Sequence, residues 1–405
     1  MKLIEKKLFE RQPDETTGVL SMAAYCSVAG DLMKYCTYIS RSDTFAGSTI
    51  SFSTDGGKTY SGTGPDRTRW ETKDGTMTNY FKLTLLDKAS GRFYMFYNRG
   101  LLPGDNPLEG LQNWQLYYTM SEDGGRTACF DEPVVMTGDY DEFHPIDDVW
   151  RGKNSFMVGD WPCSPIITTE GEILLPVQST LLDGNREIYN PGGGYTYQCS
   201  RVLHGRFTAN GEIEWHSISE KVLGDPGKST RGAIEPAIAL MPDGRILMVM
   251  RGSNGGINDP DFRLPGYRWH SVSEDGGRTF TKPSPWTYSN GGAFYSPSSC
   301  SQILCHGSGG FFWIGNICAE NPRANMPRNP LCIVEINAET LKPFMESKFD
   351  IASREETQYH DVTFSNFYAR EEKETGDILV YCTALWQSPE NIYMDADSYE
   401  YRLRL

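Results

Sequence analysis

An eight-residue pattern that occurs three times constrains the fold of this chain more than any other feature. The pattern reads S-x-D-x-G-x-T-aromatic and is complete at Ser53–Tyr60 and at Ser273–Phe280. A third copy, Ser121–Ala128, lacks only the final aromatic residue. Three unrelated Asp-Gly turns would not be expected to agree at so many positions. We therefore interpret the copies as one repeated structural unit.

Each copy has the chemistry of a fixed corner between two antiparallel strands. Glycine reaches positive φ at little steric cost, and aspartate bonds to nearby backbone N–H groups. The serine and threonine hydroxyls can tie the two arms of the turn together, and the final aromatic ring can pack below it. We therefore expect a hairpin corner at every copy.

The spacing of the copies predicts how many units the chain contains. They start at residues 53, 121 and 273, so the second gap is slightly more than twice the first. This predicts one intervening unit whose pattern has decayed, and His204–Trp215, which contains an Asn-Gly turn, lies where it should be. Division of 405 residues by the first gap gives about six units. Four-stranded units repeated radially form a propeller.

The repeated pattern resembles the Asp box, or BNR repeat, of the sialidase (neuraminidase) superfamily. The resemblance covers most of the chain. It implies an all-β fold, a six-bladed β-propeller of four-stranded antiparallel blades, formed by a single domain over residues 1–405. In that superfamily the box lies at blade turns away from the active-site face, and non-enzymatic propellers also carry it. It therefore indicates the fold more strongly than the function.

The remaining sequence fits this architecture. Almost no segment has the 3.6-residue period of an amphipathic helix. Residues 61–78 are polar, and residues 1–20 are charged and polar. The C-terminal residues 399–405 alternate and are expected to pair with an N-terminal strand, which would close the ring. Further strands are expected at 19–28, 32–40, 80–86, 92–98, 114–120, 164–168, 172–177, 331–336, 362–368 and 378–383.

Composition narrows the classes of partner. The formal net charge is −15, so an acidic surface would repel phosphate backbones and anionic lipid. Nucleic acid and membrane partners are therefore not expected. An anionic small substrate would need a local cluster of arginines acting against the overall field. The sequence does not indicate an oligomeric state.

Cysteine usage and the N-terminus bear on cofactors and location. The ten cysteines are scattered, and no Cys/His spacing suggests zinc, so neither a metal nor another cofactor is expected. No apolar run has the length of a signal peptide core or of a transmembrane helix. Free thiols without a signal favour the cytoplasm, or secretion if a leader has been trimmed.

The segment 234–251 carries the clearest functional pattern. Glu235 opens one predicted strand, residues 242–244 turn the chain, and Arg251 ends the return strand. A hairpin brings Glu235 and Arg251 to the same open end, where they could form a structural pair or share a pocket. The segment resembles a sialidase motif, which implies that Glu235 activates the nucleophile and that Arg251 belongs to the arginine triad of the family. Arg268 begins the strand into the third box and is a further substrate-binding candidate.

The resemblance also implies an arginine clamp. Sialidases hold the carboxylate of their sugar with three arginines, because guanidinium binds carboxylate through two hydrogen bonds and stays charged. Arg328 is a further candidate for this triad, with Arg323 as its competitor, and both could instead be surface residues of a Pro-rich loop. The first arginine of the family has no counterpart on the strand at 18–25, and Arg11 lies about ten residues too early.

The implied nucleophile is a tyrosine. A neutral tyrosine avoids repulsion by the substrate carboxylate, and a nearby glutamate takes its proton. The family places it in a Y-S-x-L stretch, and the nearest match here begins with Phe364. Tyr359, five residues earlier, is the available alternative. Tyr295 is a further pocket candidate, and either tyrosine could equally be a core or rim residue.

The acid/base position is implied by the loop before the first box. Asp43 lies there, although a surface aspartate is an equally good interpretation. Together the resemblances predict a retaining, exo-α-sialidase-type glycoside hydrolase with catalytic Asp43, Glu235 and Tyr359, acting on an acidic sugar at glycan ends. Two alternatives remain open: a non-catalytic carbohydrate-binding propeller, and a different glycosidase or lyase on the same scaffold.

Overall fold

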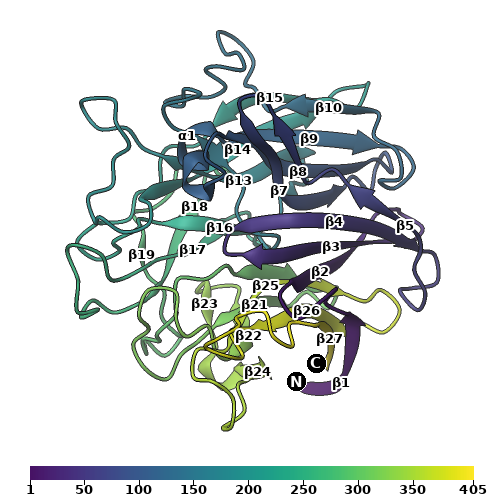
Figure 1. Ribbon diagram of the computed structural model, residues 1–405, viewed down its shortest axis with the longest axis vertical. Coiled ribbons are helices and arrows are strands. Elements are labelled where there is room, and N and C mark those ends of the chain that lie inside the picture. Colours follow the sequence, from purple (N-terminus) through teal and green to yellow (C-terminus); the bar gives the residue numbers. More distant parts are fainter.

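Six antiparallel sheets are arranged as blades about a common centre (Figure 1). The computed structural model describes residues 1–405 apart from the side chain of Phe81. Over this described part, three sheets contain four strands and three contain five. The prediction of an all-β, six-bladed propeller is therefore confirmed.

Three blades come from the first half of the chain. The first contains β2 (Gly18–Tyr25), β3 (Leu32–Arg41), β4 (Thr44–Ser53) and β5 (Ser61–Asp66). The second contains β6 (Arg69–Thr72), β7 (Gly75–Leu86), β8 (Phe93–Leu102), β9 (Gln115–Ser121) and β10 (Phe130–Pro133). The third contains β11 (Phe156–Met157), β12 (Ile166–Ile167), β13 (Glu172–Thr180), β14 (Gln198–Phe207) and β15 (Ile213–Ile218).

The other three blades follow in chain order. The fourth contains β16 (Ile234–Leu240), β17 (Ile246–Arg251), β18 (Arg268–Ser273) and β19 (Ser284–Pro285). The fifth contains β20 (Gln302–Cys305), β21 (Phe311–Asn316), β22 (Leu331–Asn337), β23 (Lys342–Pro343) and β24 (Phe349–Ala352). The sixth contains β25 (Thr363–Glu371), β26 (Ile378–Leu385), β27 (Ser398–Arg404) and β1 (Lys2–Glu10).

The ring closes between the two ends of the chain. Strand β1 pairs antiparallel with β27, with Lys6 opposite Tyr401, and Figure 1 shows the two termini next to each other. This confirms the expected pairing of the C-terminal segment. The helical segments of the described chain are the short turns η1 (Pro107–Glu109), α1 (Gly110–Asn113) and η2 (Met345–Ser347). None of the helices described has the length and apolarity needed to cross a membrane.

Three strands lie in segments that have no clear strand pattern in the sequence. Strands β5 and β6 occupy part of the polar segment 61–78, and β1 lies in the charged N-terminal region. Each is an edge strand of its sheet, and most of its side chains are exposed or half-buried. Edge strands of this kind have no buried face, so they carry no apolar alternation that a sequence pattern could reveal.

The three boxes form the same corner, between the last two strands of their blades in chain order. In the third copy the Ser273 hydroxyl donates to Asp275 at 2.8 Å and accepts from the Gly277 N–H at 2.8 Å. The Thr279 hydroxyl donates to the other oxygen of Asp275 at 2.6 Å. The first and second copies repeat these bonds. The expected tie between the two arms of the turn is thus present.

Acid is expected to weaken these corners. Burial acts to raise the pKa of Asp275, but hydrogen bonds from Thr279 and Ser273 outweigh it and lower the pKa from 3.8 to about 2. Because the folded state favours the ionised form, this contribution is present above about pH 4 and is lost as the pH falls towards 2. We expect Asp275→Ala to lower the unfolding temperature at pH 7, and the difference from wild type to narrow between pH 4 and 2. A difference independent of pH would contradict this origin.

Candidate functional site

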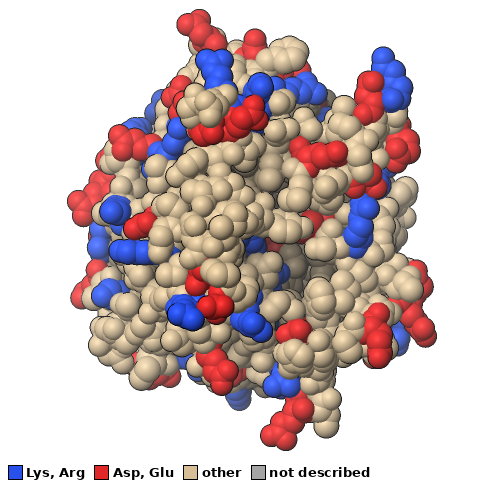
Figure 2. Space-filling view, turned by 60° about the vertical axis from the view of Figure 1, so that its left-hand side comes forward, with Lys and Arg blue, Asp and Glu red and all other residues tan. Residues whose placement is uncertain are grey.

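A cavity of about 310 Å³ lies at the centre of the ring, lined by strand residues of five blades and by loop residues next to the strands of the fifth. Its size falls in the range of small-molecule sites. The molecular face in Figure 2 is hollowed near its middle, and acidic and basic side chains are mixed over it. The charged residues that line the cavity are Asp43, Asp160, Arg231, Glu235, Arg251 and Arg328.

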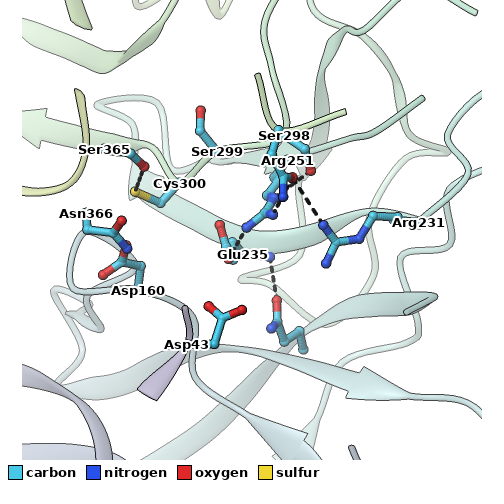
Figure 3. A network of polar contacts seen from close by, with 12 residues as sticks. Asp43, Asp160, Arg231, Glu235, Arg251, Ser298, Ser299, Cys300, Ser365 and Asn366 are labelled. Atoms are coloured by element: carbon cyan, nitrogen blue, oxygen red, sulfur yellow. Dashed lines mark hydrogen bonds and ion pairs between the residues drawn. The ribbon is translucent and has the colours of Figure 1, made fainter. Parts of the chain in front are cut away.

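Glu235 and Arg251 lie at one end of the β16–β17 hairpin, as the sequence predicted. The hairpin register places Ile234 opposite Arg251, so Glu235 follows directly. The Arg251 guanidinium donates through Nη1 to Glu235 Oε1 at 2.5 Å, and both side chains are largely buried. Its Nε donates to Ser298 and its Nη2 to Asn325. Arg251 is therefore held on three sides by the protein (Figure 3).

The backbone at Glu235 is unusual. Its φ is 48°, a left-handed value that is uncommon for a residue other than glycine and that is found preferentially at functional sites. Its N–H donates to the Gln178 side chain at 2.6 Å, which supports this conformation. The second carboxylate oxygen, Oε2, is buried and makes no hydrogen bond in the part of the protein that is described. One oxygen of Glu235 is thus bound to Arg251, and the other is buried without a hydrogen-bond partner among the described residues.

Arg328 and Arg231 complete a cluster of three guanidinium groups. Arg328 lies in the loop between β21 and β22 and donates to the Ser365 hydroxyl at 3.2 Å. Arg231 lies four residues before Glu235 and makes a longer contact, 3.4 Å, with Asn325. The Nε atoms of both arginines are buried and, among the described residues, lack hydrogen-bond partners. These two side chains therefore keep more unused donors than Arg251 does.

The pKa values of Arg231 and Arg328 are consistent with their incomplete hydrogen bonding. Burial and then the positive charge of Arg251 lower the pKa of Arg231 to about 9. The same two causes, in the same order, lower the pKa of Arg328. Three neighbouring guanidinium groups are thus incompletely neutralised by the protein. A bound anion would relieve both their mutual repulsion and their unmet hydrogen bonds.

Asp43 lies on the tight turn between β3 and β4. Its φ is 53°, which aspartate tolerates better than most residues. The carboxylate is exposed and accepts a 3.4 Å hydrogen bond from the Tyr80 hydroxyl. The Tyr80 ring stacks on Phe45 at 4.3 Å between centroids. The stacked rings of Tyr80 and Phe45 therefore support the Asp43 carboxylate at the cavity.

Asp160 is a second aspartate on the cavity, and it was not predicted. It lies in the loop after β11 and is only 3% exposed. Its carboxylate accepts hydrogen bonds from the Asn366 side chain at 2.6 Å and from the Trp161 N–H at 2.7 Å. Burial and then the Glu235 carboxylate raise its pKa to about 7. Asp160 is therefore a carboxyl group that carries a proton part of the time at neutral pH.

Two predicted binding residues do not line the cavity. Arg268 is fully buried, and its guanidinium donates to the Ser299 carbonyl and to the Ser296 hydroxyl. Arg268 begins β18, the third strand of this blade, whereas Glu235 and Arg251 lie on the first two strands, β16 and β17. Tyr295 stacks on Tyr267 at 6.2 Å between centroids, in the connection before β20. The structure thus assigns both side chains to packing around the site.

The predicted nucleophile is also not brought to the cavity. Tyr359 lies in the loop before β25, where its carbonyl accepts from the Val362 N–H and its ring contacts His360. Phe364, in the more obvious position, is 5% exposed and packs in the core between the fifth and sixth blades. The residues of β25 that do line the cavity are Thr363, Ser365 and Asn366. A register shift between Ser365 and Tyr368, with Asn366 at φ 55°, accounts for this local change of direction.

No cluster of three or more histidine, cysteine or acidic side chains suited to a metal ion is found in the part of the chain that is described. The charged residues that line the cavity can bind an anion through Arg231 and Arg328 and can transfer protons through Asp43, Asp160 and Glu235.

Comparisons with known proteins agree with the fold. A family model described as BNR repeat-like domain matches residues 83–365. A protein of unknown function from Dyadobacter fermentans superposes with a TM-score of 0.64 at 14% identity, over 100% of this chain and 99% of its own. No curated protein sequence matches the chain.

Two solved sialidases have the same architecture. An intramolecular trans-sialidase from Ruminococcus gnavus, solved with oseltamivir carboxylate, has a TM-score of 0.60 at 13% identity, over 100% of this chain and 98% of its own. A sialidase from Streptococcus pneumoniae has a TM-score of 0.61 at 11% identity, over 98% of this chain and 70% of its own. At these identities the likeness concerns the fold alone.

Proposed function

We propose a function from one premise, that this chain belongs to the BNR repeat-like domain family and has a sialidase-like scaffold. On this premise the protein is a glycoside hydrolase of the exo-α-sialidase type. It removes an acidic sugar from the end of a glycan and retains the configuration at the anomeric carbon. Its substrate is a carbohydrate with a carboxylate group, bound in the cavity at the centre of the propeller.

The observation that carries this proposal is the group of guanidiniums at the cavity. Arg231 and Arg328 have buried Nε atoms without hydrogen-bond partners among the described residues, whereas Arg251 is held by Glu235, Ser298 and Asn325. On an acidic protein of net charge −15, such a local cation cluster favours an anionic ligand that fits inside. A sugar carboxylate matches the two-donor geometry of arginine.

Proton transfer is assigned to carboxyl groups on the same cavity. Asp43, on the exposed β3–β4 turn, is positioned to protonate the leaving-group oxygen as it departs towards solvent. Glu235, with one oxygen bound by Arg251 and the other without a hydrogen-bond partner among the described residues, serves as the base that activates the nucleophile.

A panel of fluorogenic glycosides tests the proposal. It contains the 4-methylumbelliferyl α-sialoside, a uronide and neutral hexosides. We expect release of the fluorophore from the sialoside and not from the neutral sugars, with the first product keeping the substrate configuration in proton NMR. Preference for a neutral sugar would contradict the anion site, and an unsaturated product absorbing in the ultraviolet would indicate a lyase instead.

The proposed carboxylate site predicts what removal of Arg328 or Arg231 does to substrate binding. Arg328→Ala and Arg231→Ala remove charge-assisted hydrogen bonds to the substrate carboxylate, each worth about 1.5–3 kcal/mol, or roughly 10–150-fold in affinity. We expect each variant to raise KM for the acidic substrate without unfolding the protein. Arg323→Ala, on the same loop as Arg328 but exposed, is the matched control and should leave KM unchanged. Equal loss of affinity for acidic and neutral ligands would disprove the clamp.

A second candidate, a non-catalytic carbohydrate-binding propeller, is favoured by the position of Tyr359. This tyrosine, the implied nucleophile, lies in a loop outside the cavity lining. A binder would bind sialic acid in isothermal titration calorimetry, would lose that affinity in Arg328→Ala, and would release no fluorophore from the panel.

A further inference from the structure

Asp160 occupies a position on the cavity that the roles assigned above leave unexplained. It is almost fully buried, yet its loop is next to the reacting groups rather than in the packed core of a blade. The preceding residue, Gly159, packs against Glu235: a Cβ atom placed on Gly159 would be 3.2 Å from the Glu235 Cγ and 2.9 Å from the Cys163 sulfur. Any side chain at position 159 would therefore separate the Asp160 loop from Glu235.

The hydrogen bonds of Asp160 fix its carboxyl group from two sides. Asn366 on β25 donates to Oδ2, and the Trp161 N–H donates to Oδ1. Figure 3 shows Asp160 beside Asn366, with Glu235 held by Arg251 on the neighbouring blade. Asn366 owes its direction to the irregular part of β25, the strand on which the family resemblance places the nucleophile. Asp160 thus contacts the strand on which the family resemblance places the nucleophile.

We propose that Asp160 is the catalytic nucleophile of this enzyme and that Glu235 is the base that takes its proton. This inference rests on the glycoside hydrolase function proposed above, and it replaces Tyr359 in that role. In the first step a bond forms between an Asp160 oxygen and the anomeric carbon, and the bond to the leaving-group oxygen breaks. The Asp160 proton passes to Glu235, and Asp43 protonates the leaving group.

The second step restores the enzyme. Water attacks the anomeric carbon of the glycosyl ester, Asp43 takes a proton from that water, and the bond to Asp160 breaks. Glu235 returns the proton to Asp160. Atoms and charges balance over the two steps, the sum of which is hydrolysis with retained configuration.

A protonated aspartic acid solves the same electrostatic problem as a tyrosine. An ionised nucleophile would repel the carboxylate of an acidic sugar, whereas a neutral one allows it to approach. Burial, followed by Glu235, keeps the pKa of Asp160 near 7, so the neutral form is available at neutral pH.

The other titratable groups around Asp160 do not compete with Glu235 as bases. These groups are Tyr80 on β7, Cys163 on the same loop, Cys300 before β20 and Cys382 on β26. Burial raises the pKa of each of them well above its usual value, so each stays protonated at neutral pH. Glu235 is left to accept the proton.

Chemical rescue tests the inference. Asp160→Gly should lower kcat on the 4-methylumbelliferyl α-sialoside by more than about 10³-fold. Added sodium azide should then restore turnover and give a glycosyl azide, because the small anion can attack from the vacated position. Asp160→Asn, which keeps the size of the side chain, guards against misfolding and should be equally inactive but not rescued. Asp87→Asn alters another buried aspartate, which caps a turn away from the cavity, and should keep full activity.

Covalent trapping gives a second readout. Wild type incubated with 2,3-difluorosialic acid should gain one sugar, and peptide mapping by mass spectrometry should place it on Asp160. A label on a tyrosine, or undiminished turnover by folded Asp160→Asn, would overturn the inference and leave the proposed function intact. Failure of the wild type to hydrolyse any sialoside would contradict the proposed function, and the inference with it.

Discussion

Replacing Glu235 by glutamine is expected to lower kcat on an acidic glycoside by roughly 10³–10⁴-fold while leaving substrate binding almost unchanged. Glutamine keeps the size of the side chain and can still accept the bond from Arg251, but it cannot take a proton. Because Glu235 forms a largely buried ion pair with Arg251, the substitution also leaves a cation without its counter-charge. The variant should therefore unfold at a lower temperature as well.

A double substitution separates these two effects. Arg251→Met should also destabilise the protein, because it leaves the Glu235 carboxylate buried and unpaired. If the pair is the reason, the combined Glu235→Gln, Arg251→Met variant should be more stable than the sum of the single losses predicts. Its activity should remain low, because stability returns without the base. Recovery of activity together with stability would show that Glu235 has only a structural role.

The fold could be predicted from sequence because residues within the repeated box determine the geometry of the box. Ser273, Asp275 and Thr279 form their hydrogen bonds within eight residues, so the pattern needs no knowledge of distant contacts. The Glu235–Arg251 pair was accessible for the same reason, since a single hairpin brings the two residues together. Local hydrogen bonding and hairpin register are properties that a sequence pattern records directly.

The rest of the site depends on contacts between blades, which leave little local signal. Asp160 reaches Asn366 across more than 200 residues of chain, and Arg231 meets Asn325 across 94. A carboxylate within the apolar stretch around Trp161 was the one sequence signal for Asp160. For Arg231 the signal was its position four residues before Glu235. Both signals become informative only when the cavity is known.

The position of β25 residues shows why the nucleophile could not be placed by motif. Simple alternation along the strand would direct either Phe364 or Ser365 inwards, but the register shift after Ser365 adds Asn366 to the cavity. Phe364 then packs in the core. A one-residue irregularity of this kind reverses which side chains face a pocket, and no spacing rule in the sequence reveals it.

Replacing Asp43 by asparagine is expected to lower kcat by roughly 10²–10⁴-fold on a substrate with a natural sugar as its leaving group. Asparagine tolerates the left-handed backbone at this turn as well as aspartate does, so the β3–β4 hairpin should be preserved. The loss should be much smaller on 4-methylumbelliferyl glycosides, because a good leaving group departs with little protonation.

The comparison of leaving groups shows whether the Asp43 carboxylate donates a proton or acts only in substrate binding. Asp148→Asn is the matched control, because Asp148 is also an exposed aspartate with a left-handed backbone, and it pairs with Lys221 rather than lining the cavity. That variant should keep wild-type activity on both substrates. If Asp43→Asn lost activity equally on both, its carboxylate would act in binding, since a general acid is needed only where the leaving group needs a proton. The proton donor would then have to be a group other than Asp43, and the leaving-group dependence of the other cavity variants would identify it.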